Sequence, residues 1–230
     1  ILDYARIESG KLKLEHIEFD LEQLIAETLS LFTAQALEKH LRLYVSLEGG
    51  VPQRILGDPT RLKQVLMNLL SNALKFTAAG HVSLHVCRRC NAQQEWQLHL
   101  SVSDSGIGIS EQTQKTLFDS FAQGDSSTTR RYGGSGLGLA ISKDLVTLMG
   151  GQIAVCSAPG QGTQFNFQLP LQVDSSAADP LGELLAGRTA LLTSLDSLAL
   201  DAMSSLLSRW GMRPERCQTP ERLLSCLDDF

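Results

Sequence analysis

Two runs of alternating apolar and polar residues lie close together near the middle of the 230-residue chain. The first places Val82, Leu84 and Val86 at every second position, and the second repeats the pattern over 96–102. Side chains alternate between the two faces of a β-strand, so these runs predict strands with one buried face. The polar residues 91–94 between them are typical of a turn. The chain is therefore expected to contain a β-hairpin whose apolar face another element must cover.

Helices are predicted on both sides of this hairpin. Residues 20–32 form an apolar stripe behind an aspartate suited to capping, and an Asp-Pro pair predicts the start of a helix over 58–76. A further helix is expected over 137–149, followed by strands over 152–156 and 163–169. Residues 117–138 are rich in Gly, Ser and Thr and contain a basic pair, which predicts a mobile loop.

The composition changes near the C-terminus. Residues 173–187 are rich in Asp, Ser, Ala, Pro and Gly, which is typical of a linker. Beyond them we expect a strand over 189–193, an amphipathic helix ending near Arg209, a turn at Gly211 and a further helix over 220–228.

Charge and hydropathy exclude several classes of function. Twenty basic against 25 acidic residues leave a formal charge of −5, so no overall field attracts nucleic acid. No run reaches the ~18 apolar residues of a membrane span.

Of the five cysteines, only Cys87 and Cys90 are closely spaced, and a zinc ribbon needs a second such pair. We therefore interpret the cysteines as ordinary reduced thiols, with metal binding or redox use as the alternative. The five histidines are interpreted as structural or surface residues.

The helix over 58–76 has a polar edge beside its apolar face. At 100° per residue, Asn68, Asn72 and Lys75 fall together along that edge. Two carboxamides and an ammonium could hold a divalent cation and its phosphates. The alternative is an ordinary solvated helix face.

A second group follows the second hairpin strand directly. A buried Asp104 at this point could accept a hydrogen bond from the exocyclic amine of adenine, whereas the carbonyl of guanine would be repelled. Gly106 and Gly108 would let the backbone approach a flat ring. An ordinary turn is the competing interpretation of Asp-Ser-Gly-Ile-Gly.

The third group opens the helix over 137–149. Glycines repeated over 133–138 leave backbone N–H groups free to hold phosphate, and the helix N-terminus adds partial positive charge. No Gly-Lys-Ser/Thr follows, so the segment is not a Walker sequence, and no strand precedes it as a dinucleotide fold requires. A flexible hinge remains the alternative.

Taken together, the motifs resemble those of a known family. Residues 16–172 resemble the catalytic and ATP-binding domain of sensor histidine kinases, especially hybrid kinases. The matching segments, in chain order, are QVLMNLLSNALKFT (64–77), DSGIGI (104–109), LFDSFAQGD (117–125), RRYGGSGLGLAIS (130–142) and GQGTQF (160–165). The resemblance implies a two-layer α/β sandwich, in which helices cover one face of a mixed sheet and ATP lies under a lid.

The resemblance also implies roles for individual residues. Asn68, Asn72 and Lys75 are the expected catalytic residues, with Asn68 and Asn72 orienting Mg2+ and phosphates. Asp104 is expected to bind the adenine amine. Phe118 and Phe121 are expected to pack the lid, and Arg130 or Arg131 to meet the γ-phosphate. The other residues expected to contact ATP are Gly106, Gly108, Gly133, Gly134, Gly136, Leu137, Gly138, Gly160, Gly162 and Thr163.

The expected reaction is phosphoryl transfer rather than hydrolysis. Related gyrases, mismatch-repair proteins and heat-shock chaperones carry a water-activating Glu where this helix has Asn68, and an amide cannot take a proton. The family's acceptor is a His followed by an acidic residue, and none of the five histidines fits. The acceptor is therefore expected on a dimerisation domain upstream of residue 1. A regulatory pseudokinase that pairs with another histidine kinase is the alternative function.

The domain layout follows from the same resemblance. We expect the end of a dimerisation and phosphoacceptor helix over 1–14, the catalytic domain over 15–173, a linker over 174–187, and a partial, flavodoxin-like receiver segment over 188–230. That segment would be degenerate, because Ser194 and Leu195 occupy the places of a receiver's acidic pair and Asp196 lies one residue away. The alternative is an error in this alignment register.

The resemblance also indicates partners and location. They are ATP, a dimerisation domain, and receiver or phosphotransfer domains, but not nucleic acid. The fragment is expected in the cytosol, as part of a homodimeric bacterial sensor anchored in the inner membrane.

Overall fold

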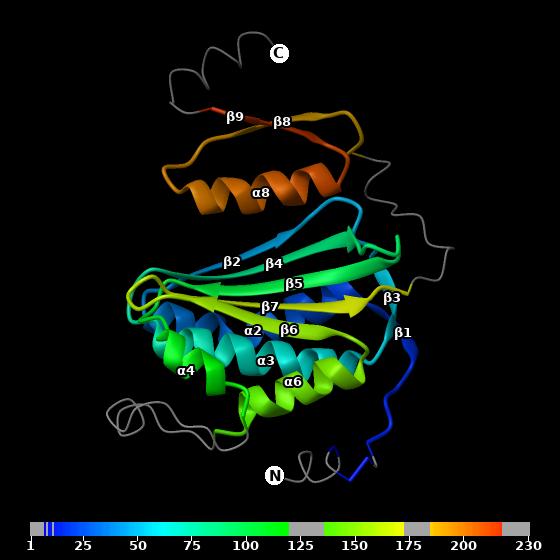
Figure 1. The fold of residues 1–230 in the computed structure, drawn as a ribbon. Coiled ribbons are helices and arrows are strands. Elements are labelled where there is room, and N and C mark those ends of the chain that lie inside the picture. The colour runs from blue at the N-terminus through cyan, green and yellow to red at the C-terminus, as the bar shows by residue number, and fades with distance from the viewer. Residues whose placement is uncertain (1–6, 8, 11, 120–135, 173–184, 218–230) are drawn as a thin grey trace.

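A mixed sheet with helices on one face forms the main unit (Figure 1). The computed structural model describes residues 7, 9, 10, 12–119, 136–172 and 185–217. The strand order in the main sheet is β2-β4-β5-β7-β6; only the β2–β4 pair is parallel. The strands are β2 (Arg42–Leu47), β4 (His81–Cys90), β5 (Trp96–Asp104), β6 (Gln152–Ser157) and β7 (Thr163–Pro170).

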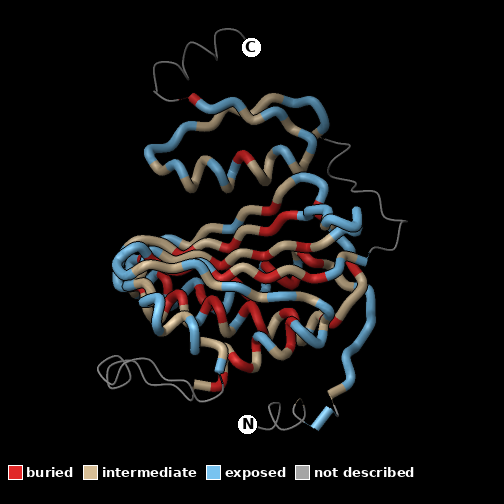
Figure 2. Tube along the Cα trace, in the orientation of Figure 1, coloured by how far each residue is buried: buried red, intermediate tan, exposed pale blue. Residues whose placement is uncertain are grey.

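The predicted hairpin is confirmed as β4 and β5. Its register pairs Val82 with Asp104 and Cys90 with Trp96. Val82, Leu84 and Val86 are buried, as the alternation predicts. Figure 2 shows that buried residues concentrate between this sheet and the helices that cover it. The inner face of the hairpin therefore forms the sheet side of the hydrophobic core.

The covering helices begin where the sequence predicts. The Asp20 side chain accepts the Gln23 N–H to cap α2, and the Asp58 side chain accepts the Arg61 N–H to cap α3. The helix expected over 137–149 is α6, one residue shorter at each end. The helices are α2 (Leu21–Glu38), α3 (Pro59–Phe76), α6 (Gly138–Leu148) and the short α4 (Glu111–Thr116), which was not predicted. The predicted two-layer α/β fold is confirmed.

A small second sheet lies at the edge of the main unit. It pairs β1 (Ile17–Asp20) with β3 (Arg54–Gly57) in antiparallel register. Neither strand was predicted, because four residues give too short a period-2 pattern. Its antiparallel pairing places the start of α2 beside the start of β3, where the Leu21 N–H donates to the Gln53 carbonyl at 2.9 Å.

The C-terminal residues form a separate β-α-β unit. Strands β8 (Thr189–Leu192) and β9 (Arg213–Arg216) pair in parallel, with α8 (Ser197–Arg209) between them. The predicted strand and helix are confirmed, whereas the helix expected over 220–228 lies outside the described residues. The receiver-like interpretation, like the boundaries of the four domains, stays a prediction.

Helix α8 lies along β2, the edge strand of the main sheet (Figure 1). The Ser205 hydroxyl donates to the Leu47 carbonyl at 2.6 Å. The Arg209 guanidinium is almost fully buried, pairs with the Glu22 carboxylate of α2 and donates to the Val51 carbonyl. A buried guanidinium needs such partners, so Arg209 ties the C-terminal unit to the main unit.

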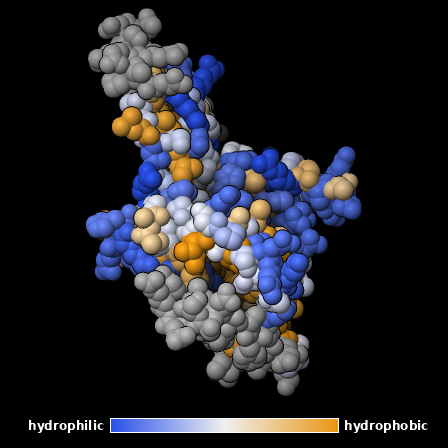
Figure 3. All heavy atoms as spheres, turned by 60° about the vertical axis from the view of Figure 1, so that its left-hand side comes forward, coloured by the Kyte–Doolittle hydropathy of each residue, from blue (hydrophilic) through white to orange (hydrophobic). Residues whose placement is uncertain are grey.

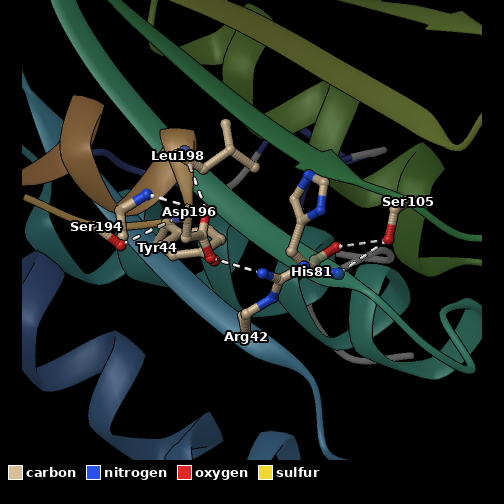
Figure 4. Close-up of polar contacts among 8 residues, drawn as sticks. Arg42, Tyr44, His81, Ser105, Ser194, Asp196 and Leu198 are labelled. Carbon is tan, nitrogen blue, oxygen red and sulfur yellow. Dashed lines mark hydrogen bonds and ion pairs between the residues drawn. The ribbon is translucent and has the colours of Figure 1, made fainter. Parts of the chain in front are cut away.

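Asp196 makes further polar contacts between the two units (Figure 4). One carboxylate oxygen accepts the backbone N–H groups of Leu198 and Ala199, which caps α8. The other accepts from the Tyr44 hydroxyl and from Arg42 at 2.6 Å. These contacts, the Tyr44 hydrogen bond first, lower the pKa of Asp196 below its ordinary value of 3.8.

This contact predicts a pH-dependent stability. Because the pKa of Asp196 is lowered in the folded state, the ionised carboxylate stabilises the fold above its unfolded pKa, and this contribution is lost as pH falls through the lower folded value. Asp196→Asn keeps a capping oxygen and removes the charge. We expect it to lower the melting temperature at pH 7, and the gap to wild type to narrow below about pH 4. Thermal unfolding of both proteins at pH 7 and below about pH 4 measures the difference in melting temperature. A difference that does not change with pH would contradict this role of the charge.

Candidate functional site

Helix α3 buries one face and presents a polar edge beside it. Leu62, Leu66 and Leu69 are buried in the core. Asn68 and Asn72, one helical turn apart, are half-buried along the neighbouring edge. Lys75 follows, with its Nζ 5.0 Å from the centre of the Phe76 ring. The structure thus places the three expected catalytic residues along one line on α3.

Asn68 is held against the start of α6. Its Nδ2 donates to the Ser142 hydroxyl at 2.8 Å. A Cβ at Gly138 would lie 2.4 Å from the Asn68 Oδ1, so no larger residue fits without displacing that amide. The glycine at the first position of α6 therefore allows α3 and α6 to approach each other at this point.

Ser142 was not predicted as a site residue, although it is buried and fixes the Asn68 amide. The sequence did contain a signal, because Ser142 lies one helical turn after Gly138 and faces the same way. A serine in a helix is common for other reasons, and only the three-dimensional contact with α3 reveals this one.

Asp104 lies at the end of β5, where the strand leads into a glycine turn. Burial raises the pKa of Asp104 above its ordinary value of 3.8. Hydrogen bonds from the backbone N–H of Gly106 at 2.8 Å, from Thr163 and from the Thr77 side chain oppose that shift. The result is a partly desolvated carboxylate acceptor. Thr77, which is buried, was another residue that the sequence did not mark for this role.

The turn beyond Asp104 packs backbone against backbone. A Cβ at Gly108 would lie 1.9 Å from the Ala158 carbonyl oxygen, and one at Gly162 would lie 1.9 Å from the Asp104 carbonyl oxygen. Both glycines have positive φ, +70° and +79°. A Cβ at Gly106 would lie 2.5 Å from the Phe76 carbonyl oxygen. These glycines thus allow the turn, the end of α3 and the β6–β7 connection to meet.

Phe118 and Thr163 flank this region. The Phe118 ring packs edge-on to Phe165 with centroids 6.3 Å apart, and the Lys143 ammonium lies 5.9 Å from its centre. The Thr163 hydroxyl lies 3.1 Å from that of Ser157. Figure 3 turns this end of the molecule toward the viewer and shows apolar atoms around a hollow.

The remaining expected residues divide into two sets. Leu137 is buried and Gly136 has positive φ just before α6, whereas a Cβ at Gly160 would meet open space. Five expected residues lie outside the described residues: Phe121, Arg130, Arg131, Gly133 and Gly134.

Comparison with known proteins identifies the family. Residues 57–173 match the model for "Histidine kinase-, DNA gyrase B-, and HSP90-like ATPase". That segment contains α3, Asp104, the glycine turn and α6. The chain belongs to this ATPase family.

Among these ATPases, the chain is similar to sensor histidine kinases. It is 40% identical over 224 residues to the sensor histidine kinase GacS of Pseudomonas protegens, covering 97% of this chain and 24% of that protein. It is 37% identical over 210 residues to the histidine-protein kinase BarA of Escherichia coli K12, covering 90% of this chain and 23% of that protein. The chain thus spans about a quarter of the length of these relatives.

Solved structures give the same result. Full-length ShkA in complex with AMPPNP matches with a TM-score of 0.79 and 29% identity, covering 97% of this chain and 45% of that one. The catalytic domain of the histidine kinase ThkA matches with a TM-score of 0.55 and 28% identity, covering 68% of this chain and 95% of that one. This histidine kinase ATPase domain has, within its described residues, no helix long and apolar enough to cross a membrane.

The close packing at Gly162 predicts a difference between two neighbouring glycines. Gly160→Ala adds only the strain of a left-handed alanine, about 1–2 kcal/mol, because its Cβ meets open space. Gly162→Ala adds the same strain and a clash with the Asp104 carbonyl. We therefore expect a larger loss of unfolding free energy in urea for Gly162→Ala. Equal losses in the two variants would contradict the close packing.

Proposed function

We propose that this domain binds ATP with Mg2+ and presents its γ-phosphoryl group to a histidine on a dimerisation domain outside these 230 residues. The observation that carries the proposal is the position of Asp104. A partly desolvated carboxylate lies at the end of a central strand, and the close-packed glycines beside it allow the turn, the end of α3 and the β6–β7 connection to meet around it.

The adenine end fits this substrate chemically. The Asp104 carboxylate can accept a hydrogen bond from an exocyclic amine, and the backbone and hydroxyl donors around it oppose the upward shift of its pKa that burial causes. A guanine would place a carbonyl oxygen against the same carboxylate. The site therefore favours adenine over guanine.

The phosphate end fits an intact triphosphate. Because the Ser142 hydroxyl accepts the Asn68 N–H, the amide carbonyl oxygen is left as a neutral ligand for Mg2+. Asn72 and Lys75 extend the same edge of α3, with Lys75 as a positive charge for phosphate. When bound, Mg2+ would supply charge neutralisation on the phosphates. Neither amide can take a proton from water, so this edge of α3 positions ATP without activating a water for hydrolysis.

The transfer then depends on positioning. The acceptor imidazole nitrogen attacks the γ-phosphorus, the bond to the bridging oxygen breaks, and ADP leaves. The domain's part is to orient the triphosphate and to stabilise the developing charge. We place this reaction in the cytoplasm, within a dimeric two-component sensor whose receiver or phosphotransfer domains take the phosphoryl group onward.

A transfer assay tests the proposal. The 230-residue chain, γ-labelled ATP and Mg2+ are incubated with a separately produced dimerisation domain that contains the acceptor histidine. We expect label on that domain, reduced about 100-fold or more by Asn72→Ala because a phosphate-orienting group is lost. ATP binding without transfer would instead support a regulatory nucleotide-binding module. No ATP binding would overturn the proposal altogether.

The proposed role of Asp104 predicts that its substitution changes the preference for ATP over GTP. Asp104→Asn removes the charge that favours the adenine amine and introduces an N–H that can donate to the guanine carbonyl. We expect the affinity for ATP to fall about 10–100-fold, which corresponds to about 1.4–2.8 kcal/mol, and the affinity for GTP to rise. Calorimetric titration of both nucleotides measures the ratio. An unchanged preference for ATP would show that Asp104 does not read the base.

A further inference from the structure

The outer face of the main sheet, opposite α2, α3 and α6, carries a second cluster of polar side chains. Ligand atoms of Glu48, His85 and Cys87 all lie within 4.8 Å of one another. The Glu48 Oε1 lies 3.2 Å from the His85 Nε2. None of these residues belongs to the ATP site described above.

The sheet topology brings the three side chains together. His85 and Cys87 are two residues apart on β4, so both point to the outer face, while Val86 between them is buried in the core. Glu48 directly follows β2, and its N–H continues the parallel ladder by donating to the Val86 carbonyl at 2.9 Å. Two neighbouring strands therefore supply the three ligands.

The chemistry of this set matches a borderline-soft divalent metal. A thiolate and an imidazole favour zinc over magnesium, which prefers oxygen ligands. Ligand atoms around a tetrahedral zinc lie about 3.3–3.8 Å apart, given metal–ligand distances of about 2.0–2.3 Å. The widest pair would need to close by about 1 Å, within the reach of side-chain rotation. We propose that Glu48, His85 and Cys87 bind one Zn2+, with its fourth position open to water.

The site opens to solvent on the side of Glu48 and His85, and the Arg89 guanidinium competes with an ion for Glu48. The side chains of Glu48 and His85 are 39% and 41% exposed, whereas Cys87 is buried beneath them, so an ion would enter past the carboxylate and the imidazole. The Arg89 guanidinium lies 3.2 Å from the same Glu48 oxygen that faces His85. This guanidinium is 59% exposed and can turn away into solvent. Zinc would replace Arg89 as the cation paired with Glu48.

The site is also separate from the nucleotide site. In the β4–β5 ladder, Asp104 pairs with Val82 whereas Cys87 pairs with His99. Five residues along a strand correspond to about 17 Å. The zinc ligands thus lie near the opposite end of the hairpin from Asp104, and their loss should leave ATP binding intact.

Cobalt titration of the nucleotide-free 230-residue chain tests the proposal, because Co2+ takes zinc's place and a thiolate ligand gives a near-ultraviolet charge-transfer band. We expect the band to saturate at one Co2+ per chain and to disappear when Zn2+ is added. Cys87→Ser should abolish it, and the matched control Cys90→Ser should keep it, because Cys90 is exposed and outside the cluster.

Two further variants keep the test informative if Cys87→Ser misfolds. His85→Gln should weaken zinc binding about 100-fold or more, measured by chelator competition, while ATP affinity stays at the wild-type value. Glu48→Gln should also weaken zinc binding, because it replaces the charged oxygen ligand with a neutral amide. The proposal is overturned if the band persists in Cys87→Ser, if wild type gives no saturable band, or if His85→Gln and Glu48→Gln bind zinc as tightly as wild type.

Discussion

The packing of α3 against the sheet determines most of what this domain can do. Leu62, Leu66 and Leu69 are buried on one face of the helix, and each such side chain contributes about 1.5–3 kcal/mol on burial. That face fixes the rotation of the helix about its axis, because any other rotation would expose leucines and bury amides. The same rotation places Asn68 and Asn72 along the edge that meets α6. The packing of the leucines in the core thus also determines where the two asparagines lie.

Local pattern was sufficient to predict the elements whose signals are local. Capping aspartates and 3.6-residue periodicity predicted α2 and α3, and period-2 alternation predicted the β4–β5 hairpin. Strand β2 was not predicted, because its partner β4 lies some forty residues later and the pair is parallel. Such pairings need a crossover connection, here one that includes α3, and no turn signature marks them.

In the candidate site, too, residues with a local sequence signal were predicted and residues that depend on distant contacts were not. Motif spacing predicted Asn68 on α3 and Asp104 at the end of β5, because each belongs to a segment with its own pattern. Ser142 and Thr77 were missed, since their importance comes only from contacts with distant residues. The glycines at 106 and 108 predicted a close approach of the backbone to a flat ring. The sequence could not tell that protein backbone, the carbonyls of Phe76 and Ala158, approaches these two glycines.

The contacts on the outer face of the sheet depend on the position of β2 at the edge of that sheet. An edge strand presents unpaired backbone groups that need cover, and α8 provides part of it where Ser205 donates to the Leu47 carbonyl. Outward side chains at the start of β2 also help to cover this edge, because Arg42 and Tyr44 donate hydrogen bonds to the Asp196 carboxylate of the C-terminal unit. The next outward position beyond the strand is Glu48, beside the thiol and imidazole of β4. Strand β2 and the residue that directly follows it therefore supply both the contact with the C-terminal unit and one of the proposed zinc ligands.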